Sequence, residues 1–286
     1  MNIGRVVSLH RYPVKSLGGE TLTSTTVTTN GLPGDRAWAV RDEERGGIRG
    51  AKRFPELMTA SARYRKEPAD LGSSVASITL PDGTEFDTDD PDAELHLSKL
   101  VGAPITFWAL RPPEDLEHYR RGRPLLDDPR EEARRVFART ADEPMPNLQG
   151  FPKELIKYES MPGTYFDAYP ILLVTTRSLD YLAERRPTSR WDPRRFRPNV
   201  LIETESAAAF PERQWVNRRV RIGTAVFQVM RTCPRCAMTT HRFADLPADP
   251  GIMRSLVRDA DGDLGVYATV AEPGRMTARD TVELLD

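Results

Sequence analysis

The sequence predicts a mostly β protein with short helices, in the α+β class, whose first domain is barrel-like. Three observations favour this class. The 24 prolines among 286 residues indicate many short elements joined by turns. Strand-length runs and turn signals alternate through the first 110 residues, and a strand-length apolar run occurs again in the second half. We expect a boundary near residue 112, with one domain over 1–112 and a second over 113–286.

The first 110 residues are expected to form mainly strands. Turn signals separate several of them, since Asn30-Gly31 follows the second and Asp82-Gly83 joins the fifth and sixth as a hairpin. A helix is expected over 92–100, where apolar residues recur at helical spacing and Gly102 ends the pattern. The expected strands are 3–10, 21–29, 36–41, 58–64, 76–80, 84–86 and 105–110.

Residues 111–163 differ from the rest of the chain. They are dense in Pro, Arg, Asp and Glu and contain few apolar runs. We interpret them as a connecting segment with short helices, centred on residues 130–137. An irregular segment of this length is uncommon in a compact protein unless it is functional or joins two domains.

The second half has clearer patterns. The apolar run at 169–175 indicates a buried strand, and a short helix at 178–185 is expected to begin at Ser178 as its N-cap. Gly223-Thr224 is expected to join two strands, the second of which leads the chain directly into Cys233. The expected strands are 169–175, 199–203, 215–222, 225–231, 264–271 and 281–285, with a further short helix at 251–258.

Composition excludes several classes of protein. The formal net charge is −1, so no global field would attract nucleic acid or an anionic membrane. No stretch of 18 apolar residues occurs and the N-terminus has no long apolar segment, so neither a membrane span nor a signal peptide is expected. Two cysteines cannot form a disulfide scaffold, and a reducing cytoplasm is the simplest location.

Both cysteines lie in one Cys233-Pro-Arg-Cys236 motif. A zinc site needs four ligands, but no second pair of this kind exists and only His241 lies nearby. A redox dithiol would begin a helix, whereas this motif follows a strand. Arg231 and Arg235 provide the positive charge that favours a reactive thiolate. Two buried, reduced thiols without a chemical role remain the alternative.

Basic residues gather at two other places. Lys15 and Ser16 end the first strand, and Arg36 opens another, so all three could converge on a phosphate. Arg197 and Asn199 stand just before the strand at 199–203, in a region rich in arginine, where Asn can both donate to and accept from a heterocycle. Solvated surface charge is the alternative explanation for both groups.

Four motifs occur in one order: Tyr12-Pro-Val-Lys-Ser16, Gly34-Asp-Arg-Ala-Trp38, Arg195-Phe-Arg-Pro-Asn199 and Cys233-Pro-Arg-Cys236 followed by two threonines. In this order the sequence resembles the MOSC-domain molybdenum enzymes that carry an N-terminal MOSC β-barrel domain. These include the mitochondrial amidoxime-reducing component and bacterial relatives that reduce N-hydroxylated bases. The resemblance covers nearly the whole chain and implies that the second domain is a MOSC β-barrel.

The resemblance implies a molybdenum–molybdopterin cofactor bound between the two domains. Cys236 would be the catalytic residue and the protein's metal ligand, since a soft thiolate suits such a metal. The reaction would be two-electron removal of oxygen from an N-oxygenated small molecule, independent of pyridoxal phosphate. The cofactor-binding positions implied for this chain are Lys15, Ser16, Arg36, Thr175, Arg197, Asn199, Arg235 and Cys236.

Two departures from the family pattern bear on substrate and electron supply. The segment after Thr240 contains His241 and Asp245, which are candidate proton donors or ordinary loop residues, instead of the family's Asp-rich turn. With two cysteines the chain has no ligands for an iron–sulfur cluster, so electrons are expected from a separate flavin reductase, ferredoxin or cytochrome. The alternative functions are a sulfur carrier with a persulfide on Cys236 and a cofactor carrier without turnover.

Overall fold

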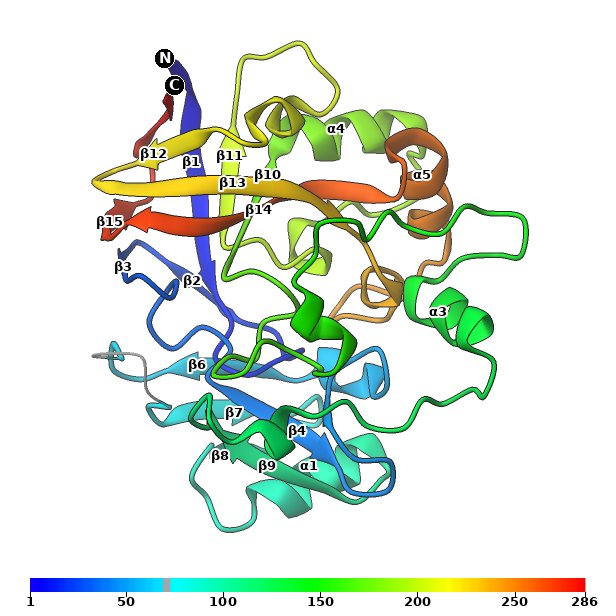
Figure 1. The fold of residues 1–286 in the computed structure, drawn as a ribbon. Helices are drawn as coiled ribbons and strands as arrows, with labels where there is room; N and C mark the ends of the chain where they lie inside the picture. Colours follow the sequence, from blue (N-terminus) through cyan, green and yellow to red (C-terminus); the bar gives the residue numbers. More distant parts are fainter. Residues whose placement is uncertain (69–72, 286) are drawn as a thin grey trace.

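The computed structural model describes residues 1–68 and 73–285, and a closed β-barrel of seven strands dominates it (Figure 1). The strands follow the order β11-β10-β14-β13-β12-β16-β1, and β1 pairs back to β11 to close the barrel. Among the seven barrel strands, only the neighbours β10 and β11 run parallel. The barrel strands are β1 (Asn2–Arg11), β10 (Ile171–Thr175), β11 (Val200–Glu203), β12 (Arg219–Ile222), β13 (Ala225–Pro234), β14 (Asp263–Glu272) and β16 (Thr281–Leu285).

The apolar run at 169–175 forms β10 and is buried on both faces. Ile171 and Leu173 face the interior of the barrel, where they join its main apolar cluster. Leu172 and Val174 face outward and pack against a second cluster under α4 (Thr176–Arg185) and α5 (Gly251–Ala260). A strand that is covered on both faces needs apolar residues at every position, and this explains the continuous run.

The N-terminal part lies below the barrel in Figure 1 and is built from two three-stranded sheets. A separate apolar core lies between these sheets and one helix. The chain leaving β1 enters this part through bridges from Val14 to Trp38 and from Gly18 to Ser61. Its elements are β4 (Trp38–Asp42), β5 (Ile48–Arg49), β6 (Ser61–Tyr64), β7 (Ala76–Thr79), β8 (Glu85–Asp87), α1 (Ala93–Val101) and β9 (Ile105–Ala109).

Strand pairing crosses residue 112. β1 belongs to the barrel of the C-terminal half, with β2 (Glu20–Leu22) at its outer edge. β3 (Ser24–Val27) pairs with β15 (Gly274–Thr277), near the other end of the chain. The segments 1–112 and 113–286 therefore share strands, and the division near residue 112 stays a prediction.

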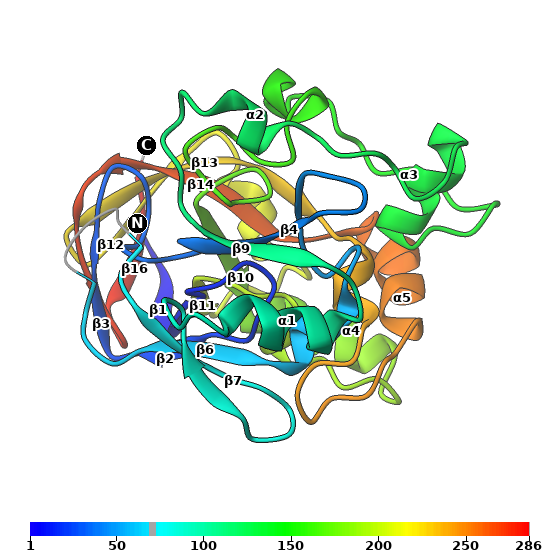
Figure 2. The same cartoon turned by 90° about the horizontal axis from the view of Figure 1, so that it is seen from below.

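The connecting segment runs along one side of the molecule and carries α2 (Leu116–Tyr119) and α3 (Pro129–Phe137), with a 3₁₀ turn at Lys153–Ile156. Figures 1 and 2 both show α3 beside α5. Arg254 of α5 donates to the carbonyl of Ala138 and, at 2.6 Å, to the carboxylate of Glu143. The segment is also fixed to the N-terminal half, since Arg135 of α3 donates to the Lys52 carbonyl at 2.7 Å.

The predicted class, mostly β with short helices, is confirmed. Ser178 as the N-cap of the fourth helix is wrong, because α4 begins after Thr175, whose hydroxyl accepts from the Ser178 N–H at 3.2 Å. The expected strand at 21–29 is two strands, and the start of 58–64 is a 3₁₀ turn at Pro55–Thr59. None of the described helices is long and apolar enough to cross a membrane.

Candidate functional site

A cavity of ≈ 770 Å³ lies where the N-terminal sheets, the connecting segment and one rim of the barrel meet. The chain reaches its wall just after β1, before β4, after β5, before β10 and β11, and at the end of β13. Arginine and lysine outnumber carboxylates among the described residues that line it. The predicted site residues in the wall are Lys15, Ser16, Arg36, Arg197, Asn199, Arg235 and Cys236.

The two cysteines of the motif occupy different environments. Cys236 is partly exposed at the cavity wall, whereas Cys233 is 1% exposed, and both thiols are free. Arg235 donates from Nη1 to the Sγ of Cys233 at 2.9 Å and from Nη2 to the Phe196 carbonyl at 2.7 Å. Burial raises the pKa of the Cys233 thiol although the guanidinium of Arg235 opposes the shift. Cys236 is therefore the accessible sulfur.

Arg197 is a buried cation with one unused hydrogen-bond donor. Its Nη1 donates to the Leu17 carbonyl, and its guanidinium carbon lies 4.1 Å from the centre of the Tyr12 ring. Its Nη2 is buried and has no hydrogen-bond partner in the described part of the chain. Burial, and then the nearby charge of Arg36, lower the pKa of Arg197 to about 10. An anion in the cavity would satisfy both the charge and the free donor.

Arg235 has a similar unmet need, because its Nε is buried without a partner among the residues described. Arg197 and Arg235, both at the cavity wall, thus each have one unsatisfied donor. Buried donors in native proteins are nearly always satisfied, so these two indicate a bound group. A guanidinium group suits an acceptor-rich anion such as phosphate.

The side-chain amide of Asn199 is hydrogen-bonded within the protein through both its oxygen and its nitrogen. Its Oδ1 accepts from the Leu172 N–H at 3.1 Å, and its Nδ2 donates to the carboxylate of Asp35 at 3.0 Å. Asp35 also accepts from the Tyr12 N–H at 2.7 Å and from the guanidinium of Arg36. The contacts of Asn199 therefore hold the carboxylate that orients Arg36, which is an indirect role for this predicted residue.

Lys15 is buried, and its ammonium donates to the Asp167 carboxylate at 2.6 Å and the Tyr165 carbonyl at 2.7 Å. Lys52 donates to the other oxygen of Asp167 at 3.3 Å. Burial works against ionisation of Asp167, but the two ammonium groups hold the pKa of its carboxyl well below its usual value. Ser16 takes a left-handed backbone conformation, with φ 73°, and its hydroxyl accepts from the Ala51 N–H at 2.9 Å.

Three candidates lie outside the cavity wall. Thr175 is fully buried, caps α4 and donates to the carboxylate of Glu212 at 2.7 Å. His241 is half-buried, and burial lowers the pKa of its imidazole. Asp245 pairs with Arg194 at 2.9 Å on the surface. The contacts of Thr175 and Asp245 are those of structural residues.

Several lining residues have no signal in the sequence. Lys52 and Asp167 had no motif around them, and Tyr267 lay within an ordinary strand pattern. Much of one wall comes from residues 121–159, which are part of the connecting segment. The unusual length of that segment was the one signal that pointed to it.

The donor set at the cavity does not form a closed metal cage. Within residues 1–68 and 73–285, no group of three or more His, Cys, Asp or Glu side chains could hold a metal ion. A structural zinc site needs four such ligands. One accessible thiol surrounded by cations suits a metal that arrives with its own ligands on an anionic carrier.

Family comparison agrees with this geometry. A model described as the MOSC N-terminal beta barrel domain matches residues 3–104, and the MOSC domain matches residues 161–283. The chain is a MOSC-domain protein. MOSC domains are associated with the binding of molybdenum cofactor. No curated protein matches this chain.

Three solved structures are similar to this MOSC-domain protein at low identity. The YUAD protein from Bacillus subtilis is 13% identical with a TM-score of 0.44, over 98% of this chain and 94% of that one. YiiM from Geobacillus stearothermophilus is 19% identical with a TM-score of 0.31, over 41% and 55% of the two chains. YiiM from Escherichia coli is 16% identical with a TM-score of 0.32, over 53% and 67%. None of these likenesses bears on activity.

Proposed function

We propose that this MOSC-domain protein is a cytoplasmic molybdenum-cofactor oxidoreductase that reduces N-oxygenated substrates, with Cys236 as the protein's ligand to the metal. One observation carries the proposal. A single cavity brings the accessible thiol of Cys236 together with two buried guanidinium groups, those of Arg197 and Arg235, that each have an unsatisfied donor.

The residues at the cavity fit a pterin cofactor that carries phosphate. The free Nη2 of Arg197 and Nε of Arg235 would each donate to an acceptor on it, and Arg36 adds a third guanidinium. Cys236 would give the metal a soft sulfur ligand. Two-electron removal of oxygen from nitrogen is the chemistry such a cofactor supplies when bound.

The chain's own residues would orient the bound molecules and limit the access of water. Asn199 holds the carboxylate of Asp35, and Asp35 in turn binds the guanidinium of Arg36. The guanidinium is therefore already ordered before an anion binds. The connecting segment covers one side of the cavity and restricts solvent there. We propose that electrons come from a separate flavin reductase, ferredoxin or cytochrome.

The experiment that tests the proposal is elemental analysis of protein made in a host that synthesises the cofactor. Wild type is expected to contain about one molybdenum per chain, and Cys236→Ser is expected to lose it because a hydroxyl is a poor ligand for a soft metal. Cys233→Ser is the matched control and is expected to keep its molybdenum, since Cys233 is 1% exposed and a serine hydroxyl can still accept from Arg235. Reduction of benzamidoxime by a reduced viologen dye then tests the activity.

Other results would overturn the proposal in different ways. A wild-type protein without molybdenum, but with a persulfide on Cys236, is a sulfur carrier. A wild-type protein that binds molybdenum through Cys236, yet reduces no N-oxygenated compound, is a carrier of the cofactor. Molybdenum retained in Cys236→Ser would remove Cys236 as the ligand.

A further inference from the structure

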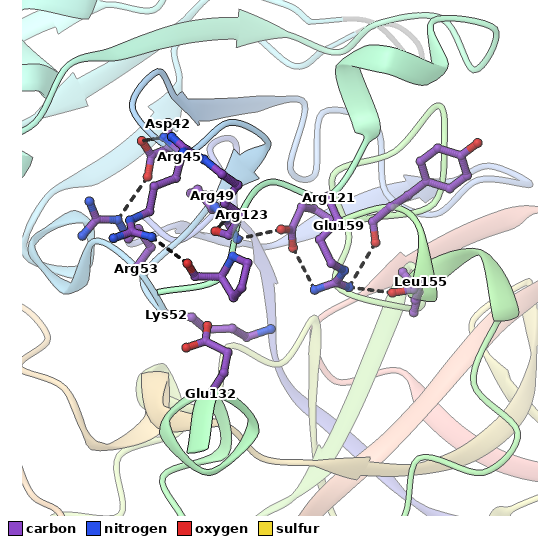
Figure 3. Close-up of polar contacts among 12 residues, drawn as sticks. Asp42, Arg45, Arg49, Lys52, Arg53, Arg121, Arg123, Glu132, Leu155 and Glu159 are labelled. Carbon is purple, nitrogen blue, oxygen red and sulfur yellow. Dashed lines mark hydrogen bonds and ion pairs between the residues drawn. The ribbon is translucent and has the colours of Figure 1, made fainter. Parts of the chain in front are cut away.

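One wall of the cavity carries cations that the proposed cofactor site does not use. Arg49 at the end of β5 and Arg121 in the connecting segment both bind the carboxylate of Glu159, at 2.6 and 3.3 Å (Figure 3). The side chains of Arg49 and Glu159 are 15% and 12% exposed. Glu159 carries one negative charge and binds two guanidinium groups. It therefore leaves one of their two positive charges without a counter-charge.

Lys52 adds a second charge of this kind. Its ammonium has one hydrogen bond among the residues described, to Asp167 at 3.3 Å, and Asp167 is already bound more closely by Lys15. An ammonium has three donors, so Lys52 has donors to spare. Its side chain is 34% exposed and faces the same cavity as Arg49 and Arg121.

Lys52 lines the same cavity as Cys236. Its ammonium is 3.3 Å from the carboxylate of Asp167, and the same cavity is lined by Glu159 and Cys236. A molecule held at this wall would therefore extend toward Cys236.

The surface next to these cations is apolar. It comes from the connecting segment, where Leu126 is 42% exposed and Ile156 is 78% exposed. Exposed apolar side chains that line a cavity are the usual surface for the body of a small molecule. The residues that form it are Leu125, Leu126, Leu148, Phe151, Leu155 and Ile156.

We propose that Arg49, Lys52 and Arg121 form an anion subsite, which selects substrates that carry a carboxylate or phosphate on an apolar body. This inference rests on the proposed function, because the substrate is taken to be the N-oxygenated compound. The anion would bind at the three cations, the body would lie on the apolar wall, and the N-oxygenated end would reach the Cys236 end of the cavity.

A purely structural role for these cations does not account for their contacts. Arg49 donates from Nη2 to the Arg123 carbonyl at 2.6 Å, and Arg121 donates from Nη2 to the Leu155 carbonyl at 2.6 Å, which ties down the connecting segment. However, the Nε of Arg49 is buried with no partner in the described residues. Among the described residues, the side chain of Lys52 makes no hydrogen bond to the connecting segment, and it lines the cavity.

The test compares two substrates that differ only in charge, benzamidoxime and 4-carboxybenzamidoxime. Wild type is expected to show a higher kcat/KM for the carboxylate, through a lower KM. Lys52→Met keeps the length of the side chain and removes the charge. It is expected to lower the ratio of the two kcat/KM values roughly ten-fold, since a hydrogen bond to a charged group is lost. Lys99→Met, on the exposed face of α1, is the matched control and leaves both values unchanged.

Calorimetric binding of 4-carboxybenzamidoxime to the same proteins keeps this test separate from the test of function. If neither compound is reduced, the proposed function fails, yet weaker binding to Lys52→Met than to wild type still supports the anion subsite. An unchanged selectivity ratio together with unchanged binding overturns the subsite. Loss of molybdenum from Lys52→Met with an unchanged ratio assigns the anion to the cofactor and overturns the substrate assignment.

Discussion

Asn199 donates a hydrogen bond to the carboxylate of Asp35 at 3.0 Å, and both side chains are buried. The two residues are 164 positions apart, and their bond joins the start of β11 to the turn before β4. Asp35 in turn accepts from the guanidinium of Arg36 at the cavity wall. The orientation of Arg36 at the cavity wall is thus set from the opposite half of the chain.

Replacement of Asn199 by Ala is expected to destabilise the protein and to lower its molybdenum content. The change leaves the buried carboxylate of Asp35 short of a donor, which costs about 1–3 kcal/mol. Urea-induced unfolding and elemental analysis measure the two effects. Asn30→Ala, in an exposed turn, is the control and is expected to behave as wild type. An Asn199→Ala protein with wild-type stability would show that this bond contributes little.

The two thiols are expected to react at very different rates in the folded protein. Cys236 is partly exposed, whereas Cys233 is 1% exposed and burial raises the pKa of its thiol, so little reactive thiolate forms there. A disulfide reagent should therefore titrate one thiol rapidly in the native metal-free protein and two after denaturation. Cys236→Ser should lose the rapid reaction and Cys233→Ser should keep it. Two rapid thiols in wild type would contradict the burial of Cys233.

Local motifs carried the predicted site residues. Cys236, Arg235 and Arg197 lie in short motifs beside strands, and the family resemblance marked them as site residues. All three line the cavity, and their roles there stay predictions. The pairing of Lys52 with Asp167 was not predictable in this way. These residues are 115 positions apart and no periodicity or motif relates them.

The same holds for the fold: a strand with a local sequence pattern was predicted, and one that depends on distant pairing was not. The apolar run in β10 predicted a buried strand because every position of that strand is covered. By contrast, β15 is four residues long and exists through its pairing with β3, far away in the sequence. Thr175, a cofactor-binding position implied by the family resemblance, lies outside the cavity wall, and its hydroxyl caps α4.

Gly122→Ala is expected to loosen the connecting segment. A Cβ at Gly122 would lie 1.8 Å from the Gly46 carbonyl oxygen, so the backbones of the β4–β5 turn and the segment must separate. Local opening around residues 120–124 should increase roughly ten-fold or more, measured by hydrogen exchange. Arg120→Ala is the neighbouring control, because its exposed side chain pairs with Glu117 on the surface. Unchanged exchange in Gly122→Ala would mean that the two backbones move apart at little cost.

Glu212 is expected to make stability depend on pH. Its carboxyl is fully buried beside the hydroxyls of Thr175 and Ser178, and burial raises its pKa above the ordinary 4.5 although those hydrogen bonds oppose the shift. The folded protein therefore binds this proton more tightly than the unfolded chain. The resulting stabilisation is complete below about pH 4.5 and is lost as the pH rises toward the folded-state pKa.

Glu212→Gln removes this titration, so the variant should gain stability relative to wild type between about pH 5 and about pH 7. The gain can reach at most about 1.4 kcal/mol for each pH unit. Urea-induced unfolding of both proteins at the two pH values measures it. Glu205→Gln, at an exposed position, is the control, and its difference from wild type should be the same at both. A pH-independent difference for Glu212→Gln would mean that the carboxyl has the same proton affinity in the folded and unfolded chains.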